Sequence, residues 1–158
     1  MTIKRCNSFL DFMEHYAYSK LLERSYCIDG CIKIVNPNQA MFYIDQGVQI
    51  LDIYPSMNYQ TGQKVLVFIV DKFESMNAYN KWQKLKGKKI EIKNLYWGTR
   101  EDKLERVVNL NQVIFYLDHN ARLYDCKPVS DFKTKSPILA FYFDREEIKE
   151  ARKLWTRR

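Results

Sequence analysis

Few residues in this chain have the chemistry needed for catalysis. Its 158 residues include two histidines, His15 and His119, and a nucleophile would need one of them as its base. His15 lies within an amphipathic helix that an apolar stripe predicts over residues 8–24. His119 adjoins a predicted helix end, where the helix dipole favours a cation. None of the known glycine-rich phosphate loops occurs among the five glycines. We therefore expect no catalytic residues and a non-enzymatic protein.

The cysteines have no metal-binding spacing. They are Cys6, Cys27, Cys31 and Cys126, and no Cys-x-x-Cys or His-x-x-x-His pair occurs. The chain also lacks an apolar run long enough to span a bilayer and a signal-peptide pattern. We expect a cytoplasmic protein with free thiols, no metal, no cofactor and no membrane partner.

The clearest chemical signal is positive charge concentrated at residues 81–109. This stretch has nine Lys or Arg against four Asp or Glu, in a chain of net charge +7. Lysines interleaved with Trp82, Tyr96 and Trp97 could follow a phosphate backbone while an aromatic ring stacks on a base. A merely solvated face is the alternative. The candidate nucleic-acid-binding residues are Lys84, Lys86, Lys88, Lys89, Lys93, Trp97 and Arg100.

Two classes of function follow from this composition. The first is an accessory or regulatory protein that contacts nucleic acid or a nucleoprotein through the basic surface. The second is a protein–protein interaction module, such as a phage-encoded inhibitor of a host defence nuclease, that uses the groove between two repeated units.

Those repeated units appear when the sequence is shifted by 73 positions. Residues 34–82 then align without a gap on residues 107–155, with 16 identities in 49 pairs. Such self-similarity indicates a tandem duplication. We expect two units packed around a pseudo-twofold axis, with Trp82 and Trp155 equivalently buried, because a unit of this size buries little alone.

Most matched polar residues fit helix ends. Asn36 and Asn109 are each followed three positions later by a glutamine, Gln39 or Gln112, as in a capping box. Asp71-x-x-Glu74 and Asp144-x-x-Glu147 predict the same device before each unit's second helix. Gly47 and Asn120 are suited to the left-handed position after a helix.

The strands of each unit follow from its apolar runs. Val48–Tyr54 and Ala121–Lys127 are predicted strands, each interrupted by an aspartate, Asp52 or Asp125. These two carboxylates have either a buried hydrogen-bonding role or a shared site. Val65–Val70 and Ile138–Phe143 are apolar on both faces, which predicts central, covered strands.

The motifs of the first unit resemble a small domain of unknown function found in low-GC bacteria and their phages. They are Gln-Ala-x-Phe-Tyr-x-x-x-Gly-Val at 39–48 and Val-Phe-x-Val-Asp at 67–71, followed by a helix ending in Trp. The resemblance implies an α-β-β-α unit in two tandem copies, and no activity or catalytic residue.

The unshared segments complete the prediction. Asp29-Gly30 predicts a β-hairpin between residues 26–28 and 31–33, and alternation predicts a strand over 88–97. Residues 99–102 are expected to cap a short charged helix.

The fold class is therefore α+β, in which duplicated α-β-β-α units share a core behind an N-terminal helix and hairpin. The segments, expected to form one compact domain, are 1–33, 34–82, a basic connecting segment at 83–106, and 107–158.

Overall fold

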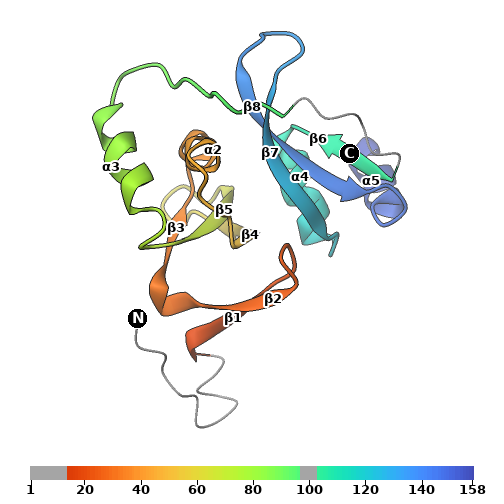
Figure 1. The fold of residues 1–158 in the computed structure, drawn as a ribbon. Coiled ribbons are helices and arrows are strands. Elements are labelled where there is room, and N and C mark those ends of the chain that lie inside the picture. The colour runs from red at the N-terminus through yellow and green to blue at the C-terminus, as the bar shows by residue number, and fades with distance from the viewer. Residues whose placement is uncertain (1–13, 97–102) are drawn as a thin grey trace.

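The protein has an α+β fold with small antiparallel sheets (Figure 1). The computed structural model describes residues 14–96 and 103–158. Strands β1 (Tyr16–Ser19) and β2 (Arg24–Cys27) pair with each other and are followed by a 3-10 turn, η1 (Ile28–Gly30). The rest of the first half comprises β3 (Cys31–Ile34), α2 (Pro37–Asp45), β4 (Asp52–Met57), β5 (Lys64–Asp71) and α3 (Met76–Lys84). The second half comprises β6 (Leu104–Val107), α4 (Leu110–Asp118), β7 (Leu123–Ser130), β8 (Pro137–Asp144) and α5 (Lys149–Thr156).

Each half builds a three-stranded sheet with the same order. The orders are β3-β5-β4 and β6-β8-β7, so the strand predicted to be central is central in both. Cys31 lies opposite Asp71 in the first sheet, and Leu104 lies opposite Asp144 in the second, each 73 positions later. Both sheets therefore have an added edge strand, β3 or β6, that the predicted α-β-β-α unit lacked.

The core lies between the two halves. Phe68 of β5 and Phe141 of β8 are fully buried, and their ring centroids are 6.4 Å apart. Helix α2 packs against β7 and β8, while α4 packs against β4 and β5. Each half thus covers its partner's sheet, and burial of each large apolar side chain contributes about 1.5–3 kcal/mol.

The two matched tryptophans lie in similar surroundings. Trp82 contacts Phe42 at 5.7 Å, and Trp155 contacts Phe115 at 5.4 Å between ring centroids. Both indoles are partly buried and pack against the core, which confirms their equivalence although neither is fully enclosed.

The predicted first-helix caps are present, but the capping boxes are not. The Asn36 side chain accepts hydrogen bonds from the backbone N–H groups of Asn38 and Gln39, and Asn109 accepts one from Gln112. The glutamine side chains instead donate to tyrosine hydroxyls one turn later, Gln39 to Tyr43 and Gln112 to Tyr116. Both tyrosines are fully buried, so an unpaired hydroxyl would be costly there. The N–H groups of the exposed first turn can instead bond to water.

Asp71 and Asp144 cap turns rather than helix starts. Each carboxylate accepts two backbone hydrogen bonds from the residues two and three positions ahead. Helices α3 and α5 begin only after that turn. Gly47 (φ 87°) and Asn120 (φ 64°) have the predicted left-handed conformation.

The predictions for the N-terminal segment hold at residues 14–15, which are helical, and are wrong from residue 16 onward. Residues 16–19 and 24–27 form strands instead of the end of a helix, and residues 8–13 lie outside the described part. The stripe there is too short to separate helical from strand periodicity. The hairpin across Asp29-Gly30 is also absent, because β2 pairs with β1 and β3 pairs with β5. Pairing with β5 buries Ile34 opposite Phe68, which local turn chemistry alone would not achieve.

Two predictions around the basic connecting segment also fail. Residues 88–96 form no strand, and the stretch expected to become a charged helix contains β6. Its predicted cap, residues 99–102, lies outside the described residues. Among the described residues, no helix is long and apolar enough to cross a membrane.

Candidate functional site

The segment that contains the predicted basic site is attached to the core by hydrogen bonds to its backbone. The basic connector, residues 84–96, runs from the end of α3 across to the β7–β8 hairpin (Figure 1). Towards its C-terminal end, the backbone N–H groups of Lys93 and Asn94 donate to the Asp45 carboxylate at 2.7–3.1 Å, and the Asn94 amide donates to the Asp45 carbonyl. Asp45 ends helix α2 and is only 8% exposed. The connector is therefore held to the core without forming a β-ladder.

Its far end is fixed on the second sheet. The backbone N–H of Tyr96 donates to the Pro128 carbonyl at 2.9 Å, and the Tyr96 ring lies edge-on to Tyr142. The Lys127 ammonium lies 4.0 Å from the Tyr96 ring centroid, within cation–π range. Ile90 and Ile92 pack against the core, which explains the alternation that resembled a strand.

The connector lysines face solvent as expected. The side chains of Lys84, Lys86, Lys88, Lys89 and Lys93 are exposed. Among the described residues, no carboxylate lies within ion-pair distance of any of them. Trp97 and Arg100 lie outside the described residues. The structure thus brings five of the seven predicted residues together on one anchored segment.

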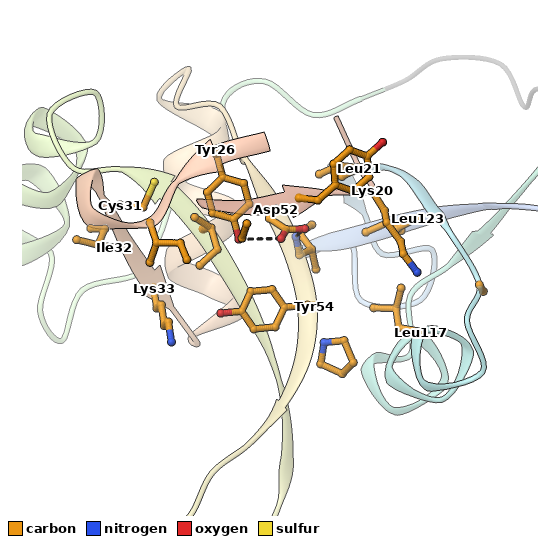
Figure 2. A pocket seen from close by; sticks show the side chains of 17 residues that line it. Lys20, Leu21, Tyr26, Cys31, Ile32, Lys33, Asp52, Tyr54, Leu117 and Leu123 are labelled. Carbon is orange, nitrogen blue, oxygen red and sulfur yellow. Dashed lines mark hydrogen bonds between the residues drawn. The ribbon is translucent and has the colours of Figure 1, made fainter. Parts of the chain in front are cut away.

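A pocket of 430 Å³ lies on the opposite side of the first sheet. The β1–β2 hairpin covers the outer face of β3, β4 and β5, and the start of β7 with the end of α4 completes the wall. The lining is mainly apolar and aromatic, with Lys20 and Lys33 among its polar residues. Figure 2 shows Asp52 near its centre, with Tyr26 and Tyr54 beside it.

Asp52 and Tyr26 form the polar centre of this pocket. The Tyr26 hydroxyl donates to Asp52 Oδ2 at 2.9 Å (Figure 2). The backbone N–H of Ile53 donates to Oδ1 at 2.9 Å. Burial raises the pKa of Asp52, and the two hydrogen bonds oppose that rise. Burial and the adjoining carboxylate raise the pKa of Tyr26, so its hydroxyl stays a donor at neutral pH.

A thiol also lines the pocket. Cys31 donates its S–H to the Cys27 carbonyl at 3.1 Å. Burial, with the nearby Asp71, raises the pKa of the Cys31 thiol to about 11. This thiol is therefore protonated at neutral pH and is not an activated nucleophile.

Asp125, which matches Asp52 in the repeat, has a different environment. Its side chain is 44% exposed, pairs with the Lys127 ammonium at 3.2 Å and accepts the Cys126 backbone N–H. Among the described residues, no tyrosine donates to Asp125 as Tyr26 donates to Asp52, because the β1–β2 hairpin covers the first sheet. The buried hydrogen-bonding role therefore applies to Asp52 alone, and the two aspartates do not form a shared site.

Comparison with known proteins found no match. No family model matches it, and no curated protein or solved structure matches it significantly. The resemblance to an α-β-β-α domain therefore rests on the sequence motifs alone. Among the described residues, no group of three His, Cys, Asp or Glu side chains is placed to hold a metal ion.

Two residues of these sites, Asp45 and Tyr26, were missed by the sequence analysis. Asp45 ends a helix, where the dipole disfavours a carboxylate, and Asp118 repeats this at the end of α4. An unfavourable carboxylate at the same position in both helices could have indicated that each carboxylate accepts hydrogen bonds from residues elsewhere in the chain. Asp118 indeed pairs with the Lys64 ammonium of β5 at 2.5 Å. Tyr26 had no such signal, because its role depends on the placement of the hairpin.

Proposed function

We propose that the protein binds nucleic acid through the basic connector in a non-enzymatic, accessory or regulatory role. The observation that carries the proposal is a row of exposed lysines that have no carboxylate partner among the described residues, on a segment whose C-terminal end is anchored at Asp45 and Pro128. Such a row suits a polyanion, because each phosphate contact releases counterions.

Anchoring matters because a polyanion gains most from charges that are already positioned. The connector backbone is held at Lys93, Asn94 and Tyr96 by hydrogen bonds to Asp45 and Pro128, so that at this end binding would order mainly side chains. The first repeat is unsuited to the same role. Residues 34–80 carry two basic and four acidic side chains, which would repel phosphates.

The test compares two charge-matched variants in salt titrations with DNA and RNA. Both lower the net charge by four, so a non-specific charge effect is equal in both. The connector variant replaces Lys84, Lys86, Lys88 and Lys89 with Gln. The control variant replaces the exposed residues Lys72, Lys103, Lys149 and Lys153 with Gln.

The connector variant should bind all sequences more weakly, since phosphate contacts carry no sequence information. The slope of log K against log salt should fall by about 0.9 per lost contact for duplex DNA and about 0.7 for single strands. The control variant should keep most of the wild-type slope. Equal losses in both variants, or wild-type protein without salt-sensitive affinity, would refute the proposal.

We further propose that the two halves are diverged copies of one duplicated unit, related by a pseudo-twofold axis. The constant offset of 73 residues supports this, since it relates strand registers, helix bounds and the Phe68–Phe141 contact alike. We also propose, from the sequence motifs, that each unit is related to the small phage and bacterial domain and, from the composition, that the protein is cytoplasmic.

A protein partner, such as the nuclease of a host defence system, is the second candidate. Phe73, Met76 and Tyr79 are 72%, 47% and 45% exposed along the turn before α3 and its first residues. Their counterparts in the second half are charged, so this apolar surface is not demanded by the shared fold. Capture from lysate that survives nuclease treatment, and is lost when Phe73 becomes Ser, would favour this candidate.

A further inference from the structure

The tips of the β4–β5 and β7–β8 hairpins are built alike. In the first, the Asn58 side chain accepts the Gln60 N–H, and the Gly62 N–H donates to the Asn58 carbonyl at 2.7 Å. In the second, the Asp131 side chain accepts the Lys133 N–H, and the Lys135 N–H donates to the Asp131 carbonyl at 2.9 Å. These bonds fix each six-residue tip, 58–63 and 131–136, in a defined conformation.

Each tip presents an aromatic ring to solvent at the same position. Tyr59 is 93% exposed and Phe132 is 84% exposed, the two most exposed large apolar residues in the described part of the chain. Neither ring contributes to the core. A fully solvated phenylalanine gains nothing for the fold, and a rigid tip lowers the entropy lost when the ring binds something.

The two tips differ in charge. Phe132 is followed by the exposed Lys133 and Lys135, and the Lys135 ammonium lies 5.1 Å from the Phe132 ring centroid. Tyr59 is followed by uncharged residues, Gln60 to Gln63, before Lys64, whose ammonium is paired with Asp118. Of the two tips, the Phe132 tip therefore combines an exposed ring with cations that form no ion pair within the described part of the chain.

We propose that Phe132 is a stacking platform for an unpaired base, and that the ligand class is single-stranded nucleic acid. Lys133 and Lys135 would contact the phosphates on either side of that base, and the connector lysines would hold the strand further along. Bases in a duplex are already stacked on each other, so they offer no free face on which the Phe132 ring could stack. This inference rests on the proposed function, because it names the ligand of the same basic surface.

Its test uses the Tyr59 tip as the control. Phe132→Ala, Phe132→Trp and Tyr59→Ala are compared with wild type for binding to single-stranded DNA, single-stranded RNA and duplex DNA at fixed salt. Loss of one stacked base should weaken single-strand binding about 5- to 150-fold in Phe132→Ala. Tyr59→Ala should stay close to wild type. Duplex affinity should hardly change in any variant.

Phe132→Trp should retain or strengthen single-strand binding, and its added indole fluorescence should be quenched on binding. Both substitutions leave the salt slope near its wild-type value, because no charge is removed. If Phe132→Ala binds single strands as wild type does while the connector variant is weakened, this inference fails and the proposed function stands. If wild type binds no nucleic acid, both fail. Equal losses from Phe132→Ala and Tyr59→Ala would also overturn the assignment.

Discussion

Replacing Tyr26 with phenylalanine removes one hydrogen bond from a carboxylate that has little access to water. Asp52 is 7% exposed, and the Tyr26 hydroxyl and the Ile53 N–H are its hydrogen-bond donors. A hydrogen bond to a charged group contributes about 1.5–3 kcal/mol, and one between neutral groups contributes about 0.5–1.5 kcal/mol. The substitution should therefore lower the free energy of unfolding by about 1.5–3 kcal/mol at pH 7.

The loss should shrink in acid. The folded-state pKa of Asp52 is raised, so its contribution to stability is fully present below the unfolded-state pKa and is lost as the pH rises through the folded-state pKa. The Tyr26 bond lowers that folded-state pKa, so Tyr26→Phe should raise it further. The variant should then lose more stability than wild type as the pH rises above the unfolded-state pKa of an aspartate, about 3.9.

Urea unfolding of both proteins at pH 3.5 and pH 7 measures this difference, provided that the m-value is unchanged. Tyr124→Phe is the matched control. Its hydroxyl donates to the exposed Glu147 at 2.5 Å, where water can replace it, so a change of no more than about 0.5 kcal/mol is expected. An equal loss from Tyr26→Phe at both pH values would refute the reasoning about Asp52.

Other changes test the shared core and the helix caps. Phe68→Ala and Phe141→Ala should each cost about 3–5 kcal/mol in urea unfolding, and the double variant should deviate from their sum because the two rings touch; strict additivity would contradict a common core. Asn36→Ala and Asn109→Ala should each cost about 0.5–2 kcal/mol and leave nucleic-acid binding unchanged; lost binding at unchanged stability would identify a site residue instead.

The predictions from sequence were correct where local sequence preferences and the overall fold favour the same structure. The repeat offset placed both central strands, the first helices and the left-handed Gly47 and Asn120, because burial and backbone sterics are readable in residue types. It failed where tertiary contacts choose the partner. Asp29-Gly30 is a strong turn signal, yet η1 leads β3 away to the edge of β5.

The connector shows why a correct pattern can give a wrong element. Ile90 and Ile92 alternate with the charged residues Lys89, Glu91 and Lys93 because one side of the chain packs against the core. Strand pairing needs a free edge, but the backbone donors at Lys93 and Asn94 are taken by a carboxylate. The lysines of the candidate site could be predicted, whereas their anchoring to Asp45 could not.

Helices α2 and α4 each lie on the sheet of the other half, and this arrangement also determines how the protein unfolds. If α2 leaves, β7 and β8 lose their cover, and if α4 leaves, β4 and β5 lose theirs. Neither half can melt while the other persists, despite the two similar sheets. Heating should therefore give one calorimetric transition, and the amides of β5 and β8 should exchange with deuterium at closely matched, slow rates.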